Sequence, residues 1–227
     1  METVIVSKLE EHFAKYKIKH YKKGQTLVVI GDTPSAVFFL KEGYTKMSTI
    51  LGNGNELTLN IYKPGSLFPM FLALGDAINN YAFTTMTDSQ IYEAPKGEVI
   101  KYLKENPDVS FDLIKRILAG VDGLLTNYNH LLTGDAETRV ASALSIAAKR
   151  FGEKTKDGVV IDLALTHQDI ANLAGISRET ASIAIERLSK EGIVGQIKRK
   201  FTVSDMDKLL EKTDMGKGGS PDDPSII

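Results

Sequence analysis

Residues 165–188 read LTHQDIANLAGISRETASIAIERL, and this stretch decides the fold of the C-terminal part of the 227-residue chain. Thr166 is placed to cap a short helix over residues 167–174, with acidic Asp169 in its first turn. Gly175 allows the tight turn that follows, and Ser177 is placed to cap a second helix. The spacing predicts a helix-turn-helix.

The second predicted helix has two different faces. Its inward stripe is apolar and comprises Ala181, Ile185 and Leu188. Its outward face is polar and comprises Arg178, Glu179, Ser182 and Lys190. Gly192 ends the helix, and residues 193–203 form a predicted hairpin with three basic residues near its tip: Lys198, Arg199 and Lys200. A helix start in the major groove and a basic wing on the phosphates favour DNA binding. The alternative is a helical hairpin for protein contact with an ordinary solvated turn.

The first hundred residues are patterned as short strands separated by turns. Gly52-Asn53-Gly54-Asn55 is a strong hairpin turn, because Gly and Asn tolerate positive φ. The predicted strands cover residues 26–30, 37–40, 44–49, 56–62, 81–86 and 90–94. Several short strands at this spacing indicate a small β-barrel or roll.

A helical apolar repeat of three and four begins after Pro107 and continues to Leu132. The stripe either packs only on its own domain or forms a coiled-coil seam with a second copy, and its width allows both. Gly120 and Gly123 stand inside it, where each costs about 0.5–1 kcal/mol relative to Ala. They indicate either close helix packing or a softened switch element.

Gly134 and Asp135 are suited to end that helix and to cap another that runs to about Phe151. The chain therefore divides into a β-roll sensor domain (1–106), a dimerisation helix (107–133), a winged helix-turn-helix domain (134–212) and a disordered tail (213–227). With 28 Lys+Arg against 29 Asp+Glu, DNA affinity must come from the placement of charge. The absence of cysteine excludes disulfides and thiolate metal sites. No signal peptide or membrane span is expected, so a cytoplasmic protein is predicted.

The quoted helix-turn-helix residues resemble the signature of the cyclic-AMP receptor/fumarate–nitrate regulator (Crp/Fnr) family. The resemblance extends along the chain. Several glycines fall at the family's roll turns, and Asn106-Pro107-Asp108 falls at the start of its dimer helix. Arg139 falls early in the helix that follows Gly134 and Asp135. It implies an α+β protein with a jelly-roll, cyclic-nucleotide-binding-like domain. It also implies a homodimer on a palindromic site in double-stranded DNA, with RNA polymerase as a partner. The implied base contacts are Arg178, Glu179 and Ser182. The implied backbone contacts are Thr166, His167, Gln168, Ser177, Thr180, Lys198, Arg199 and Lys200.

Several positions depart from the family pattern. Where the family holds ribose with Gly-Glu and cyclic phosphate with Arg-Ser or Arg-Thr, this chain has Pro69-Met70 and Asn80-Tyr81. Because these residues lack the required hydroxyl acceptor and the guanidinium, no cyclic nucleotide is expected to bind. Many members place a third base-reading Arg where this chain has Ile183, which could touch a thymine methyl or pack against the domain.

The signal that would control the protein is not identified by the sequence, and no cofactor is predicted. A haem ligand would have to be one of four histidines, with His130 on the dimer helix the best placed: His12, His20, His130 and His167. A polar residue on a helix face is the simpler interpretation of His130.

An apolar set on the roll and the dimer helix either lines a small-molecule pocket or belongs to a core that binds nothing: Phe68, Met70, Phe71, Tyr81, Phe83, Leu124, Leu125 and Tyr128. The sequence favours a DNA-binding regulator over two alternatives. One is a ligand-binding module that acts on another protein. The other is an enzyme, for which no nucleophile, metal or P-loop motif is present.

Overall fold

A computed structural model describes residues 2–75 and 78–213 of the chain. The side chains at 2, 3, 126, 127, 129, 130 and 133 are outside that description, so the haem-ligand hypothesis for His130 falls outside the described residues. The chain divides into two compact units, and each is considered by itself. One comprises residues 1–49 and 58–117, and the other comprises residues 50–57 and 118–227.

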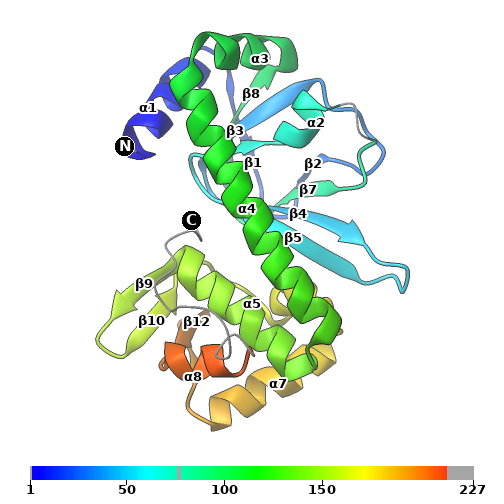
Figure 1. The fold of residues 1–227 in the computed structure, drawn as a ribbon, viewed down its shortest axis with the longest axis vertical. Coiled ribbons are helices and arrows are strands. Elements are labelled where there is room, and N and C mark those ends of the chain that lie inside the picture. Colours follow the sequence, from blue (N-terminus) through cyan, green and yellow to red (C-terminus); the bar gives the residue numbers. More distant parts are fainter. Residues whose placement is uncertain (1, 76–77, 214–227) are drawn as a thin grey trace. The chain divides into compact units, whose positions relative to one another are not determined.

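The first unit is a β-roll of two four-stranded sheets (Figure 1). One sheet has the order β1-β8-β3-β6 and the other the order β2-β7-β4-β5. The pairs β1–β8, β8–β3, β3–β6, β2–β7 and β7–β4 are antiparallel. Its strands are β1 (Ile18–Tyr21), β2 (Thr26–Val28), β3 (Ala36–Glu42), β4 (Thr45–Ile50), β5 (Glu56–Tyr62), β6 (Leu67–Phe68), β7 (Ala82–Thr85) and β8 (Ser89–Pro95). The last residue of β4 and the first two of β5 are assigned to the second unit. The helices on this unit are α1 (Glu2–Phe13), α2 (Met70–Leu74), α3 (Lys96–Glu105) and the first turns of α4 (Pro107–Thr133).

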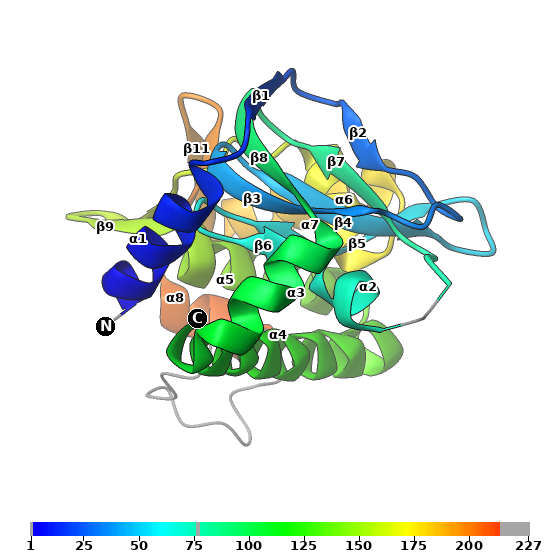
Figure 2. The same cartoon turned by 90° about the horizontal axis from the view of Figure 1, so that it is seen from above.

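Two apolar cores hold the roll together. The core between the two sheets is centred on Phe68 and Phe83, whose rings stack with centroids 5.6 Å apart. The second core lies on the outer face of the β1-β8-β3-β6 sheet, where α1, α3 and the start of α4 cover it (Figure 2). Phe13 of α1 stacks on Phe39 of β3 there, at 5.3 Å between centroids. Burial of these side chains explains why short strands and a charged N-terminal helix form one unit.

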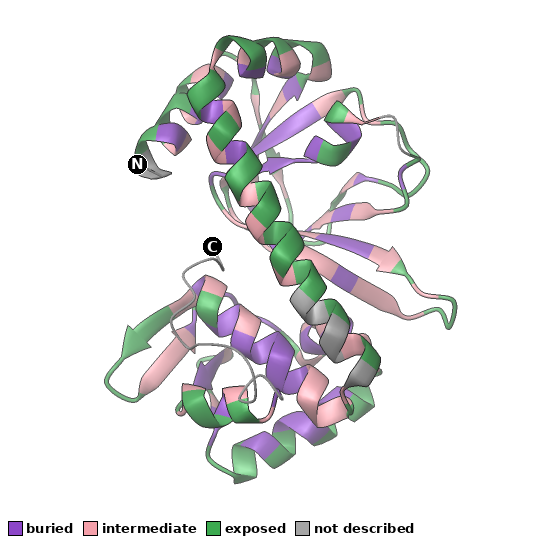
Figure 3. Cartoon of the chain, viewed as in Figure 1, coloured by how far each residue is buried: buried purple, intermediate pink, exposed green. Residues whose placement is uncertain are grey.

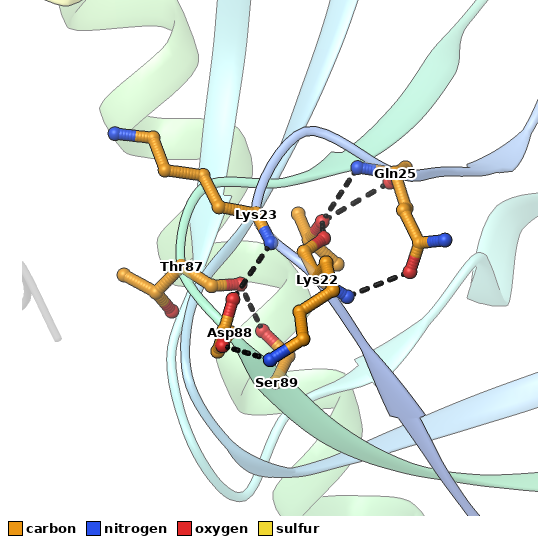
Figure 4. Close-up of polar contacts among 7 residues, drawn as sticks. Lys22, Lys23, Gln25, Thr87, Asp88 and Ser89 are labelled. Carbon is orange, nitrogen blue, oxygen red and sulfur yellow. Dashed lines mark hydrogen bonds and ion pairs between the residues drawn. The ribbon is translucent and has the colours of Figure 1, made fainter.

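The turn that joins β1 to β2 is fastened to the turn between β7 and β8 (Figure 4). The Asp88 carboxylate accepts hydrogen bonds from the Lys23 backbone amide at 3.0 Å and from Nζ of Lys22 at 2.8 Å. The Lys22 ammonium also lowers the pKa of the Asp88 carboxyl. Oε1 of Gln25 accepts from the Lys22 amide at 2.6 Å. Because Lys22 and Asp88 are exposed, their ion pair orders the turn more than it stabilises the fold.

Helix α4 begins at Pro107 and runs for 27 residues, as the apolar repeat predicted. Val109 and Leu113 are buried in the roll core. Beyond them the apolar stripe is exposed (Figure 3), and its members are Ile114, Ile117, Leu118, Val121, Leu124, Leu125, Tyr128 and Leu132. Among the described residues, no side chain and no backbone outside the helix itself is near enough to contact a Cβ added at Gly120 or Gly123. Packing on its own chain therefore accounts for the first turns of the stripe and for Leu131 near its end, which is half-buried beside Gly175, but not for the exposed residues between them.

The second unit contains the rest of α4, a four-stranded sheet and four further helices among the described residues. Its elements are α5 (Ala136–Phe151), β9 (Gly152–Thr155), β10 (Gly158–Ile161), α6 (His167–Ala174), α7 (Arg178–Lys190), β11 (Val194–Ile197), β12 (Lys200–Val203) and α8 (Met206–Glu211). The sheet order is β11-β12-β10-β9. Lys212 bridges Glu137 of α5 and Glu191 at the end of α7, at 2.9 and 2.7 Å. Lys212, at the end of α8, therefore links that helix to α5 and to the end of α7.

Asp135 caps α5, as predicted, by accepting a hydrogen bond from the Thr138 amide at 2.9 Å. This bond is the main reason that the pKa of the Asp135 carboxyl is lowered.

We expect Asp135→Ala to reduce the free energy of unfolding by about 1 kcal/mol in urea titrations, while Asp135→Ser, which keeps a capping oxygen, stays near wild type. The lowered folded pKa means that the carboxylate's contribution is complete above the ordinary pKa and declines as the pH falls below it. Equal losses in the Ala and Ser variants would contradict the capping role.

Some predicted boundaries differ from the structure. The strand predicted for residues 26–30 ends at Val28, because two hydrogen bonds to Asn79 bend the chain there. The Asn79 side-chain amide donates to the Val29 carbonyl, and the Gly31 backbone amide donates to the Asn79 carbonyl. The strand predicted for 81–86 covers Ala82–Thr85. Of the predicted tail, only Thr213 is described. It is buried, and its hydroxyl donates to the Leu210 carbonyl at 2.7 Å.

Candidate nucleic-acid interface

Helices α6 and α7 form the predicted helix-turn-helix. Thr166 and Asp169 make a reciprocal capping box at the start of α6, in which each side chain bonds to the other residue's backbone amide. Gly175 ends α6 with φ 64°, in the left-handed region that favours glycine. Ser177 Oγ accepts from the Thr180 amide at 3.2 Å and caps α7. The local sequence therefore fixes both helix starts and the turn between them.

The inward face of α7 is a continuous apolar stripe. Ala181, Ala184, Ile185 and Leu188 are all buried in this unit. Because these residues recur at three- and four-residue spacing, they fix the rotation of the helix about its axis. The opposite face is therefore held outward.

Arg178 and Glu179 are exposed in the first turn of that outward face. The Glu179 carboxylate accepts from its own backbone amide and from the Ser177 hydroxyl, and these bonds lower the pKa of its carboxyl. Glu179 is therefore a charged acceptor at neutral pH, as a cytosine amino group requires. The Arg178 guanidinium offers the planar fork that matches the O6 and N7 atoms of guanine.

Ser182 has a neighbour that the sequence did not reveal. Nδ1 of His167 lies 2.9 Å from Oγ of Ser182, and the imidazole stacks on Phe201 of β12 at 5.9 Å between centroids. A hydrogen bond thus links His167 and Ser182, two predicted DNA contacts on different helices, although they are fifteen residues apart in the sequence. Ile183, next to Ser182, is 55% exposed, so the alternative that it packs against the domain is wrong.

The wing is the hairpin of β11 and β12. Lys198 and Arg199 form its tip with φ of 50° and 66°, a conformation that non-glycine residues seldom adopt. Lys200, by contrast, lies in β12 and its ammonium is paired with the Asp162 carboxylate. The three basic residues therefore fall into two classes: two at the tip and one with an acidic partner.

Two hollows adjoin the helix starts. An open one of about 510 Å³ is lined by Thr166, His167, Gln168 and Arg178, which are all predicted DNA contacts. Nε2 of Gln168 donates to Oδ1 of Asn172 at 2.8 Å, and Nδ2 of Asn172 donates to Glu56 at 2.6 Å. Glu56 belongs to the 50–57 segment of this unit, and it also lines a smaller hollow of about 180 Å³. Asn172 was not singled out in the sequence, because a buried amide on a helix carries no motif.

The roll places the candidate effector residues in two environments. Phe68, Met70 and Phe83 are buried in its cores. Phe71 is 40% exposed and meets the half-buried Tyr81 edge-to-face at 5.4 Å between centroids. Leu124, Leu125 and Tyr128 are exposed on α4 in the other unit.

Two family models match the chain in the order of its folded parts. Residues 18–106 match a cyclic nucleotide-binding domain, and residues 138–212 match a Crp-like helix-turn-helix domain. This chain belongs to the Crp/Fnr family. The predicted α+β architecture, with a jelly-roll domain followed by a winged helix-turn-helix, is confirmed for this Crp/Fnr protein.

The relatives of this Crp/Fnr protein are transcription regulators. It is 28% identical over 188 residues to the global nitrogen regulator of Nostoc sp., covering 82% of this chain and 84% of that one. It is 22% identical to a CRP-like cAMP-activated global transcriptional regulator of Mycobacterium tuberculosis, covering 85% and 86% of the two chains. The solved structure of a CooA mutant from Carboxydothermus hydrogenoformans superposes with a TM-score of 0.76 at 24% identity, covering 89% and 90%. Within the described parts of the chain, no helix is long and apolar enough to cross a lipid bilayer.

Proposed function

We propose that this Crp/Fnr protein is a sequence-specific transcription regulator of the cytoplasm that binds a palindromic promoter site as a homodimer. The observation that carries the proposal is the outward face of α7. Exposed Arg178 and Glu179 stand together at a capped helix start, with the basic tip of the wing in the same unit. This is the arrangement with which a helix reads base edges while a neighbouring hairpin contacts phosphates.

The exposed stripe of α4 supports the homodimer. Eight large apolar side chains from Ile114 to Leu132 lie uncovered along one helix. An uncovered stripe at this spacing is typical of a coiled-coil seam. A two-fold dimer would also supply the paired recognition helices that two half-sites require.

Control through the roll by a signal other than a cyclic nucleotide is part of the proposal. No residue between 68 and 81 is Lys or Arg, so this stretch offers no cation to a cyclic phosphate. Phe71 and Tyr81, partly exposed and in edge-to-face contact, would instead meet an apolar effector. RNA polymerase is the proposed protein partner, by analogy with regulators of this family.

A mobility-shift assay with promoter fragments from the source genome tests the function. We expect discrete complexes with some fragments that survive an excess of random DNA, because specific sites typically bind 10³- to 10⁷-fold more tightly than random sequence. A regulatory module that contacts only protein would give no such complex with any fragment.

The wing should act as a phosphate clamp. We expect the double change of Lys198 and Arg199 to Ala to weaken binding to all sequences alike. The plot of log affinity against log salt should lose about 0.9 in slope for each phosphate contact removed. Affinity measured by fluorescence anisotropy at several salt concentrations gives the slope.

Lys200 provides the matched control for that measurement. Its ammonium is paired with Asp162 in the protein itself, so Lys200→Ala should change the slope less than Lys198→Ala or Arg199→Ala alone. A double variant whose slope is unchanged while its sequence preference shifts would show that the tip contacts bases and not the backbone.

A further inference from the structure

The outward face of α7 carries one feature that phosphate binding and polar base contacts do not explain. Ile183 is 55% exposed, and it is the one large apolar side chain among the described residues of α7 that is exposed. The inward positions on both sides of it, Ala181, Ala184 and Ile185, are buried. The side chain therefore cannot turn into the core without displacing residues that fill it.

Ile183 lies on the same stripe as the polar base-contact residues. Ser182 and Ile183 stand three and four residues after Glu179, and Glu186 stands four and three residues after them, which places all four along one side of the helix. Ile183 is four residues beyond Glu179, or about 6 Å along the axis. Base pairs stack about 3.4 Å apart, so Ile183 meets a base pair at most about two steps from the one that Glu179 meets.

Its polar neighbours on the stripe are engaged within the protein. The Ser182 hydroxyl lies 2.9 Å from Nδ1 of His167, and the Glu186 carboxylate is 2.7 Å from Nζ of Lys190. At this level of α7, the side chain of Ile183 therefore offers an exposed hydrocarbon surface beside polar groups that already have partners. In the major groove only thymine presents a methyl group that such a surface can contact.

We infer that Ile183 is a specificity-determining residue that reads a thymine by contact with its 5-methyl group. The inference rests on the proposed function, because it requires α7 to enter the major groove. The thymine lies in each half-site within two base pairs of the position that Glu179 reads. At this position, isoleucine therefore specifies a base through an apolar contact, whereas the arginine of many family members would specify one through hydrogen bonds.

Replacement of thymine by deoxyuridine tests the inference, because deoxyuridine pairs like thymine and lacks only the methyl. The preferred site is first selected from a random pool, and each thymine of its half-sites is then replaced in turn. For the wild-type protein we expect about fourfold weaker binding per half-site at one thymine, the loss that corresponds to one buried methyl group. Ile183→Ala should bind the thymine and deoxyuridine sites alike, and Ile183→Val should keep most of the difference.

Ile50→Ala is the matched control, because Ile50 is an exposed isoleucine on β4 and should keep the full difference. A selected half-site without thymine in that window would overturn the inference, as would a wild type that ignores the methyl or an Ile183→Ala variant that still senses it. In each of these outcomes a selected palindrome remains, so the proposed function stands. If no site is selected at all, the proposed function fails together with the inference.

Discussion

Replacing Leu124 with Glu is expected to convert the protein from dimer to monomer. Leu124 is an interior member of the exposed α4 stripe. Each copy would lose the burial of a leucine, at about 1.5–3 kcal/mol per side chain, and would bring an unpaired carboxylate into the seam. The change is made twice in a two-fold dimer, so the dimer dissociation constant should rise by at least about a hundredfold. Tyr128→Glu should act in the same way, and sedimentation velocity over a concentration series measures both.

Lys115→Glu is the control for charge on α4. Lys115 is exposed on the same helix but is not a member of the stripe, so its variant should remain a dimer although its charge changes by more. An unchanged dimer in the Leu124 and Tyr128 variants would place the interface on another surface. The monomers, if they form, should still fold, because both positions are solvent-exposed in the single chain.

Arg178→Ala is expected to cause the largest loss of specific DNA binding. A bidentate contact to guanine contributes about 1–3 kcal/mol, and a palindrome contains two such contacts. Affinity for the preferred site should therefore fall by about thirtyfold or more, while affinity for random DNA changes little. Quantitative anisotropy on the two kinds of DNA measures the ratio.

Arg187 offers a matched control for that variant. It is an exposed arginine on the same helix, nine residues or about 13 Å further along than Arg178. Arg187→Ala removes the same charge at a distance from the helix start that is predicted to read guanine, and it should preserve the preference for the selected site. Equal losses in the two variants would mean that charge alone, and not base contact, explains the role of Arg178.

Local sequence signals predicted much of this fold. Helix α6 has the predicted bounds, and Asp135 and Ser177 cap as expected, since capping depends on residues within one turn. The apolar repeat gave α4, because its period persists over many turns. Strands β1, β6, β9 and β10 and helices α1, α2, α3 and α8 were not predicted. For β1, β6 and α3 the partners that bury the element are distant in the sequence.

The candidate site shows the same division. Arg178 and Glu179 could be identified because their position in the first turn of a helix sets their direction. The pairs His167–Ser182 and Lys200–Asp162 could not, because tertiary folding alone brings these residues together. The sequence left open whether Ile183 is free to touch a thymine methyl or packs against the domain. The packing of the helices in the second unit leaves its side chain exposed.

Selection of bound oligonucleotides from a random pool is the decisive test of specific DNA binding, because it assumes neither a target gene nor an effector. We expect an enriched two-fold palindrome. Each half-site should contain a guanine whose enrichment disappears when the selection is repeated with Arg178→Ala. Failure to enrich any sequence, or a palindrome whose base preferences survive Arg178→Ala unchanged, would contradict the account.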